Sequence, residues 1–187
     1  MLEDNTVGDM ECFNLYPYAI IKDLDIGDIL NIDFNSVLVQ VIEKNKDHLC
    51  IRVLSSGLIG SNKAVSLQKQ LFLPPLTKKD KQAISIALDF DIIYFALSFA
   101  NTVNDVIMLK SIIGKNKFVI SKIESLDGLS NLKEICTESD AILIDRGDLS
   151  RQVPIERLPL IQKKIIRKAK KLKTLPEVYI GNGRTRN

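Results

Sequence analysis

The sequence predicts an α/β protein built around a parallel sheet, with a small β module before it. After residue 74, short apolar runs rich in β-branched residues alternate four times with segments of helical period. Two of these runs end in charged residues, which is typical of buried parallel strands that open at their C-terminal ends. Before residue 74, only short strand patterns separated by turn residues occur. Such alternation favours a parallel sheet with right-handed crossovers.

The first part of the chain is divided at residue 16. Residues 1–15 are acidic and irregular, and we expect a tail there. Residues 16–73 carry the small β module, in which turn residues separate the predicted strands. We expect those strands at residues 28–33, 36–43 and 49–54.

Residues 74–187 carry the strand–helix alternation. Pro74 and Pro75 open this part, and Thr77 followed by Asp80 is a capping-box-like helix start. A second helix is expected to end near Gly114. We expect strands at 92–99, 119–124, 142–144 and 177–180, with helices from about 77, from about 104, at 129–137 and at 155–172.

Charged residues at two strand ends form a candidate site. Lys122 and Glu124 share one face of their predicted strand, because side chains alternate along a strand. Asp148 arrives after the next strand, so two carboxylates and an ammonium are expected to converge. Carboxylate oxygens with open positions suit Mg²⁺ or Mn²⁺ holding an anionic substrate. The alternative is a buried Lys122–Glu124 pair with a structural role only.

Several motifs extend this pattern along the chain. They are Lys-Ile-Glu at 122–124, the run at 128–135, Ser-Asp at 139–140, Arg-Gly-Asp-Leu at 146–149, Pro-Ile-Glu at 154–156 and the runs at 57–67 and 76–80. Together they resemble the pyruvate kinase family over roughly residues 16–180, which is the middle third of that family's usual length.

The resemblance implies a fold and a reaction. Residues 74–187 would form about four units of a TIM-type (β/α)₈ barrel, whose chemistry lies at the C-terminal ends of its strands. Residues 16–73 would be the later half of the small β-barrel lid domain. The implied activity is Mg²⁺-dependent phosphoryl transfer between phosphoenolpyruvate and ADP, in glycolysis.

The resemblance also implies roles for five residues of this sequence. Lys122 would be the catalytic residue that stabilises charge on the transferring group, and Glu124 and Asp148 would hold Mg²⁺ or Mn²⁺. The backbone amides around Gly147 and Asp148 would bind the substrate carboxylate. Lys63 would approach the nucleotide phosphates, unless it is only a solvated turn lysine.

The sequence departs from the family pattern at several positions. Asp145 stands where the family has alanine, which predicts either repulsion of an anionic substrate or an added metal ligand. Ser150 replaces a glycine, Asn101 replaces an arginine, and Asn182 replaces a threonine. The family's K⁺ site is expected, but its residues and the opening barrel strand have no counterpart in this sequence.

Three functions therefore stay open. The first is a pyruvate kinase-type phosphotransferase whose open barrel edges are covered by self-association or a partner chain. The second is a catalytically degenerate relative that serves as a metal- or anion-binding interaction module. The third is a lyase that handles a pyruvate-like enolate without a nucleotide.

The net charge, the apolar segments and the cysteines limit the partners and the location that we expect for this chain. The net charge of +3 is modest, and we expect no nucleic-acid partner. No signal peptide or apolar span of membrane length occurs, so no membrane association is expected. Cys12, Cys50 and Cys136 are widely spaced and odd in number, which favours reduced thiols and a cytoplasmic location.

Overall fold

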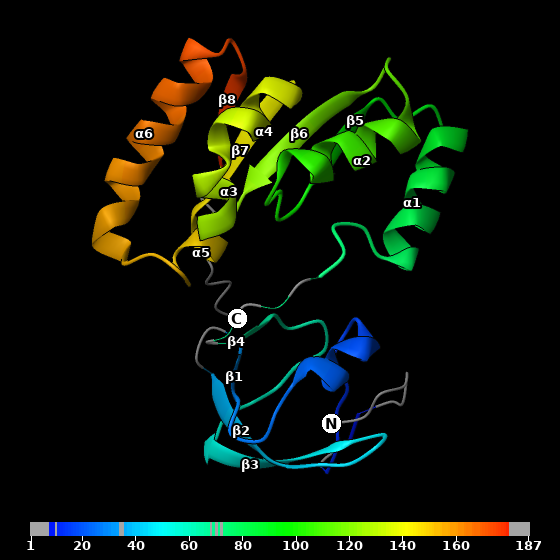
Figure 1. Cartoon of the computed structure of the whole chain (residues 1–187), viewed down its shortest axis with the longest axis vertical. Coiled ribbons are helices and arrows are strands. Elements are labelled where there is room, and N and C mark those ends of the chain that lie inside the picture. The colour runs from blue at the N-terminus through cyan, green and yellow to red at the C-terminus, as the bar shows by residue number, and fades with distance from the viewer. Residues whose placement is uncertain are drawn as a thin grey trace. The chain divides into compact units, whose positions relative to one another are not determined.

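The computed structural model describes residues 8–9, 11–33, 36–67, 69, 71 and 73–179, with the backbone alone described at 176–179. The chain divides into two compact units, one ending at Leu73 and the other beginning at Pro74. Each unit is described by itself (Figure 1). The expectations for residues 1–7, for Ile180 and for Asn182 in the tail lie outside the described residues.

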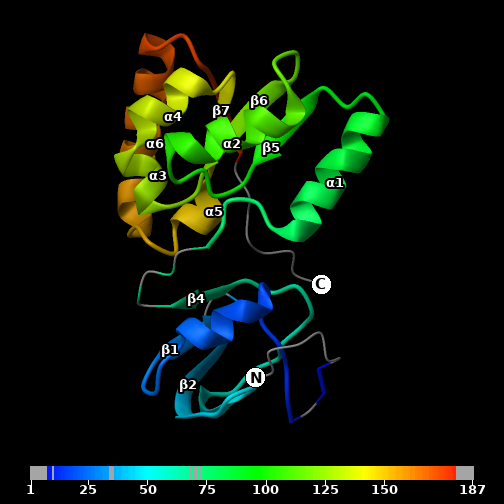
Figure 2. The ribbon, with the colours of Figure 1, turned by 45° about the vertical axis from the view of Figure 1, so that its right-hand side comes forward.

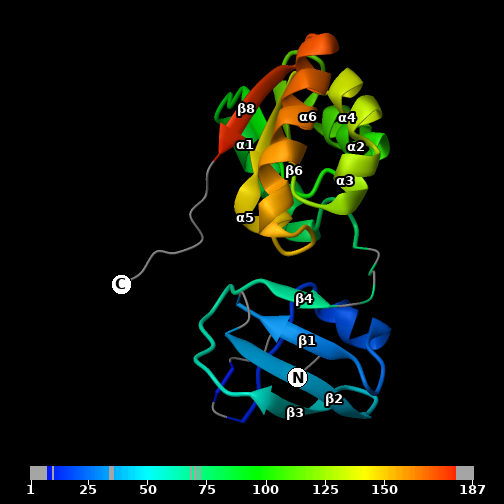
Figure 3. The same cartoon turned by 90° about the vertical axis from the view of Figure 1, so that its left-hand side faces the viewer.

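The first unit is an antiparallel sheet with strand order β3-β2-β1-β4 (Figure 3). Alternate residues of β2 point into its core, so Val37, Val39 and Val41 are buried. The strand β4 was not expected, because three residues are too few to show a period of two. The elements are the 3₁₀ helix η1 (Tyr18–Asp23), β1 (Ile29–Ile32), β2 (Val37–Lys44), β3 (Leu49–Ser55) and β4 (Val65–Leu67).

The second unit is a parallel sheet with strand order β5-β6-β7-β8. Strands follow one another in the sheet as they do in the sequence, which confirms the predicted α/β class. The strands are β5 (Tyr94–Leu97), β6 (Phe118–Ile123), β7 (Ala141–Asp145) and β8 (Leu175–Tyr179), and the helices are α1 (Lys78–Asp89), α2 (Val103–Ile113), α3 (Leu126–Ser130), α4 (Leu132–Glu138), α5 (Arg146–Leu149), η2 (Ile155–Arg157) and α6 (Leu158–Lys171).

Local signals fix the ends of the first two helices. The Thr77 hydroxyl accepts a hydrogen bond from the Asp80 amide at 3.2 Å, and Asp80 accepts one from the Thr77 amide at 2.8 Å. Thr102 and Asp105 form the same capping box at the start of α2. The α2 helix ends at Gly114, whose φ of 84° suits a residue without a Cβ.

The single helix expected at residues 129–137 is two helices, α3 and α4. The break falls at Asn131, whose side-chain amide donates to the carbonyl oxygen of Asn101 at 2.8 Å. Gly128 in α3 lies against the neighbouring loop, where a Cβ would come within 2.8 Å of the Ala100 carbonyl oxygen. These contacts are tertiary, and helical period alone does not reveal them.

Helices cover one face of the parallel sheet. Figure 3 shows α2, α3, α4 and α6 gathered on one side of it, and Figure 2 shows α1 beside β5. The β6 residues Val119, Ser121 and Ile123 point to the helices and are buried. Ser121 and Ser139 share a buried hydrogen bond of 2.7 Å between their hydroxyls, so these polar groups are satisfied inside the core.

The other face of the sheet is bare within the described residues. Tyr94 is 66 % exposed and Leu175 is 58 % exposed, although both lie in strands. The expectation of a fully buried strand at 92–99 is therefore wrong. The strand β5 is an edge strand, so only its helix-facing residues Phe95 and Leu97 are buried.

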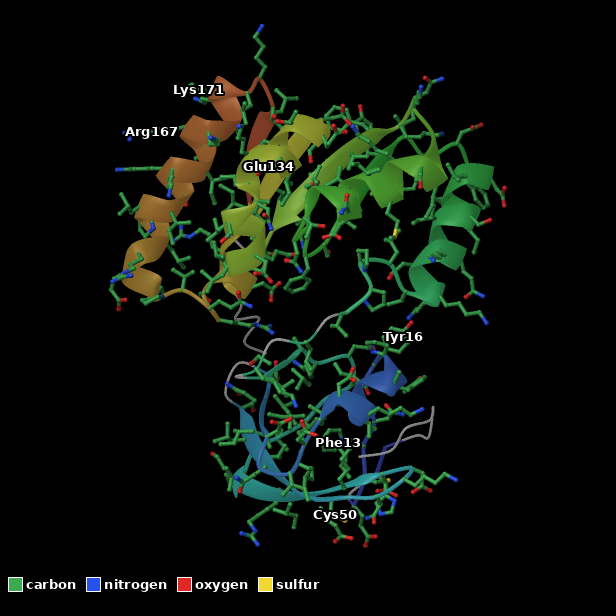
Figure 4. All side chains as sticks on the ribbon, in the orientation of Figure 1. Phe13, Tyr16, Cys50, Glu134, Arg167 and Lys171 are labelled. Atoms are coloured by element: carbon green, nitrogen blue, oxygen red, sulfur yellow. The ribbon has the colours of Figure 1, made fainter. Side chains whose placement is uncertain are left out.

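Basic residues gather on the outer side of α6. Arg167 and Lys171 project away from the sheet in Figure 4, and the helix buries Leu158, Ile165 and Ala169 on its inner side. The basic run thus forms a solvated helix face near a C-terminus, where positive charge is favoured. Among the described residues, no helix is long and apolar enough to cross a bilayer.

Candidate functional site

The C-terminal end of β6 positions two members of the site. Lys122 lies on the bare face of the sheet, opposite to Ser121 and Ile123, which point to the helices. Glu124 follows the last strand residue and lies on the same face as Lys122, as the alternation of side chains requires. The Lys122 ammonium donates a hydrogen bond of 2.6 Å to Oε1 of Glu124.

Glu124 is a buried carboxylate with two donors. It is 1 % exposed, and its Oε2 accepts a hydrogen bond of 2.7 Å from the backbone amide of Phe99. Burial raises the pKa of Glu124, and the hydrogen bonds from Lys122 and Phe99 offset only part of that effect. The two bonds satisfy a group that would otherwise be costly to bury.

Lys122 stays charged because of its neighbours. Its side chain is 21 % exposed, and its ammonium lies 3.6 Å from Oδ2 of Asp145 and 3.5 Å from the Ser98 hydroxyl. Burial alone would lower the pKa of Lys122. The hydrogen bond from Lys122 to Glu124 and the charges of Glu124, Asp145 and Asp148 outweigh burial, and the pKa is raised.

The neighbouring strand β7 and the short helix α5 supply the other carboxylates. Asp145 ends β7 and caps α5, and its Oδ1 accepts a hydrogen bond of 3.0 Å from the Gly147 amide. Asp148 lies in the first turn of α5 and pairs with Arg151, whose Nη2 is 3.1 Å from Oδ1 of Asp148. Parallel strands end at the same edge of a sheet, which is why these residues meet Lys122 and Glu124.

The three carboxylates fit a divalent cation. Glu124, Asp145 and Asp148 each offer an oxygen atom, and these oxygens lie within 4.8 Å of one another. Hard oxygen donors of this kind suit Mg²⁺ or Mn²⁺, which keep part of their shell for water or substrate. The two predicted ligands, Glu124 and Asp148, therefore fit the expected metal, and Asp145 lies beside them.

The structure brings Lys122, Glu124, Gly147 and Asp148 together, and it places Lys63 in the other unit. There Lys63 pairs with Asp33 at 3.0 Å, and its side chain is 43 % exposed. The Gly147 amide, expected to bind a substrate carboxylate, already donates to Asp145. The functional roles of all these residues stay predictions.

Three groups at the site were not predicted. The Phe99 amide is a backbone donor, and a pattern of side chains in the sequence does not predict it. The Ser98 hydroxyl lies on the neighbouring strand end, which the sheet order alone brings close. Arg151 stands three residues after Asp148, and this spacing on a helical segment is a signal that could have indicated the pair.

Comparisons with known proteins agree on one family. Residues 3–176 match the family described as pyruvate kinase, barrel domain. A pyruvate kinase of Staphylococcus haemolyticus is 32 % identical over 172 residues, which are 88 % of this chain and 29 % of that protein. A pyruvate kinase of Methanocaldococcus jannaschii is 38 % identical over 151 residues, which are 79 % of this chain and 34 % of that protein.

A solved structure supports the same conclusion. The crystal structure of Cryptosporidium parvum pyruvate kinase matches with a TM-score of 0.78 and 32 % identity, over 86 % of this chain and 36 % of that one. This chain thus spans about a third of the length of these relatives. The open four-stranded sheet is part of such a barrel, which confirms the predicted partial barrel.

Proposed function

The chain belongs to the pyruvate kinase family, and from this premise we propose that it is a phosphotransferase of pyruvate kinase type. The observation that carries the proposal is the ammonium of Lys122, held 2.6 Å from the buried carboxylate of Glu124. The carboxylates of Asp145 and Asp148 lie beside this pair at one end of two adjacent parallel strands. Catalysis of phosphoryl transfer depends mainly on such positioned charges.

Each residue has a proposed role. Glu124 and Asp148 would hold Mg²⁺ or Mn²⁺, which when bound neutralises negative charge on the reacting oxygens. Lys122 would stabilise charge on the transferring group, because its ammonium is fixed by Glu124 and kept protonated. Gly147 and Asp148 would orient the substrate through their amides, and Lys63 would serve the nucleotide.

The substrates and partners are part of the proposal. Phosphoenolpyruvate or a similar small anion and ADP would be the substrates, in a cytoplasmic reaction of glycolysis. The bare sheet face, with Tyr94 and Ile120 on it, supports completion of the site by self-association or a partner chain. The two edge strands β5 and β8 offer unpaired backbone groups for such an association.

A non-catalytic function is the second candidate. It is favoured by Asp145, which engages both the Gly147 amide and the Lys122 ammonium and leaves the site rich in negative charge. In that case the cluster would bind a metal or an anion in an interaction module. A lyase that handles an enolate would need Lys122 and the metal, and no nucleotide.

Calorimetric titration of the 187-residue chain with Mn²⁺, then oxalate, then ADP separates these functions. We expect weak Mn²⁺ binding, because few protein ligands leave most coordination positions to water. Oxalate, which mimics an enolate, should then bind, and ADP should bind after it only if the chain is of kinase type. The double variant Glu124→Gln/Asp148→Asn should lose Mn²⁺ binding.

The matched control is Glu134→Gln/Glu156→Gln. It makes the same change in net charge at two exposed positions, one on α4 (Glu134, Figure 4) and one in η2, and should bind Mn²⁺ as the unmodified chain does. Equal Mn²⁺ affinity in the unmodified chain and in Glu124→Gln/Asp148→Asn would contradict the proposed metal site. Oxalate binding without ADP binding would favour the lyase.

A further inference from the structure

Asp145 contacts two hydrogen-bond donors of the site at the same time, the Gly147 amide and the Lys122 ammonium. Its Oδ1 accepts the Gly147 amide at 3.0 Å, and its Oδ2 lies 3.6 Å from the Lys122 ammonium. The side chain is 15 % exposed, so both contacts are shielded from most solvent. A carboxylate with one oxygen on a backbone amide and the other near an ammonium stands where a bound anion would be expected to stand.

The charges around this position are unbalanced. Among the described residues, Glu124, Asp145 and Asp148 form ion pairs with two cations, Lys122 and Arg151. One negative charge is left over when these five side chains are counted. An incoming anion therefore meets a site that already holds its own anion and carries excess negative charge, and like charges in a partly buried site repel strongly.

We infer that Asp145 acts as an internal anion that fills the anion-binding position of this site. An external oxyanion or carboxylate binds only after the Asp145 side chain has left the Gly147 amide and the Lys122 ammonium. Asp145 is thus a specificity-determining residue, and it lowers the affinity of the site for small anions. The inference rests on the proposed function only in taking the Lys122 cluster as the ligand site.

Two substitutions separate the parts of this inference. Asp145→Asn removes the charge and keeps a side-chain oxygen that accepts the Gly147 amide, so the N-cap of α5 is preserved. Asp145→Ala removes both the charge and the acceptor, which frees the amide and the ammonium. If Asp145 fills the position, anion affinity should increase from the unmodified chain to Asp145→Asn and again to Asp145→Ala.

The test is calorimetric titration with oxalate at Mn²⁺ concentrations that saturate each variant. We expect Asp145→Ala to bind oxalate about tenfold or more tightly than the unmodified chain, because one like charge a few ångströms away is removed. Asp145→Asn should lie between them. Glu134→Gln, on the outer side of α4, removes a distant charge and should leave oxalate affinity unchanged.

A second measurement follows the Gly147 amide directly. In metal-free buffer with a chelator, the Gly147 signal in an amide NMR spectrum should move on addition of oxalate in Asp145→Ala. In the unmodified chain it should stay in place at the same concentrations. This arm needs no metal, so it tests Asp145 even if the proposed metal site fails.

Each opposite result overturns the inference. Weaker oxalate binding in Asp145→Asn at saturating Mn²⁺ would show that Asp145 works with the metal. Equal tightening in the two variants would leave charge alone as the cause, without occupation of the Gly147 amide. An unmoved Gly147 signal in an Asp145→Ala chain that retains its amide spectrum would show that the freed donors form no anion site.

Discussion

Glu124 and Lys122 stabilise each other as an ion pair at the C-terminal end of β6. Glu124 is fully buried, and apart from the Phe99 amide its polar partner is the Lys122 ammonium. Removal of one member of a buried ion pair typically costs about 3–5 kcal/mol, because a charge is left uncompensated. The loss of stability should be smaller here, since the Lys122 side chain is 21 % exposed and water can partly solvate its charge. Variants of Lys122 therefore need a stability measurement beside any activity measurement.

Cys136 offers a residue-scale prediction about reactivity. It is 1 % exposed in α4, and burial raises the pKa of its thiol from 9.0 to about 11. Two pKa units mean about a hundredfold less thiolate below pH 9, and the thiolate is the reactive form. Ellman's reagent at pH 8 should therefore modify Cys136 about a hundredfold more slowly in the folded chain than in the unfolded chain, and after the half-buried Cys12 and Cys50.

The same thiol affects stability at high pH. The unfolded chain ionises Cys136 near 9.0 and the folded chain near 11, so the free energy of unfolding falls as pH rises between these values. Cys136→Ala should abolish both the slow phase and this part of the pH dependence. Three thiols that react at one fast rate in the folded chain would contradict the prediction.

At the scale of elements, the sequence predicted where helices end better than where a helix is interrupted. The Thr77–Asp80 capping box and the Gly114 terminus are local signals, and both were predicted and are confirmed. The break between α3 and α4 was missed because Asn131 is held by a carbonyl of another loop. Local sequence patterns indicate contacts between residues that are close in the sequence. They do not indicate a tertiary contact such as the one between Asn131 and Asn101.

Gly128 provides the prediction at this scale. A Cβ there would come within 2.8 Å of the Ala100 carbonyl oxygen, which belongs to the backbone and cannot rotate away. Gly128→Ala should therefore lower the free energy of unfolding by about 1–3 kcal/mol, as overpacking does, although alanine favours helices. Denaturant unfolding followed by circular dichroism measures the change.

The control for this change lies two residues further along α3. Ser130 is exposed, so Ser130→Ala should alter the free energy of unfolding by no more than about 0.5 kcal/mol. Equal stability of Gly128→Ala and Ser130→Ala would mean that the loop at Ala100 moves freely. Close packing of α3 against that loop would then contribute nothing to stability.

At the scale of the whole molecule, the alternation of strands and helices in the sequence was enough to predict which site residues lie close together. Lys122, Glu124 and Asp148 were predicted to converge because parallel strands end at one edge of a sheet. In the structure Lys122 pairs with Glu124, and carboxylate oxygens of Glu124 and Asp148 lie within 4.8 Å of each other. The engagement of Gly147 by Asp145 and the Phe99 amide on Glu124 were beyond prediction. They depend on the conformation of loops, which side-chain patterns do not encode.

The open sheet is the reason why we expect the isolated chain to be a poor catalyst. Its four parallel strands form an open sheet whose bare face carries Ala96, Ile120 and Leu143 beside Lys122. Water that reaches such a face weakens every electrostatic contact at the site. Asn101, where the family has arginine, accepts hydrogen bonds from Ser125 and Asn131 at the two ends of α3 and adds no cation.

The last prediction is that the isolated 187-residue chain does not convert phosphoenolpyruvate and ADP to pyruvate and ATP at a rate typical of the family. Loss of one positioned cationic group costs roughly 10³–10⁵ in the rate of phosphoryl transfer. Within the described part of the chain, Lys122 is the one ammonium that pairs with the buried carboxylate of Glu124. An assay coupled to lactate dehydrogenase, with Mg²⁺ and K⁺ present, measures the turnover. Slow exchange of the methyl protons of pyruvate should survive, because it needs Lys122 and the metal and no nucleotide.

Lys122→Met is the decisive variant, and Lys122→Met/Glu124→Gln is its control for folding, since it removes both members of the buried pair. Both should abolish the proton exchange, while Glu134→Gln should retain it. Sedimentation of the assayed sample shows whether any turnover belongs to a self-associated species, in which a second copy covers the bare face. Robust ADP-dependent pyruvate formation by the monomer, lost in Lys122→Met while the fold persists, would show that an open half of the barrel suffices for phosphoryl transfer.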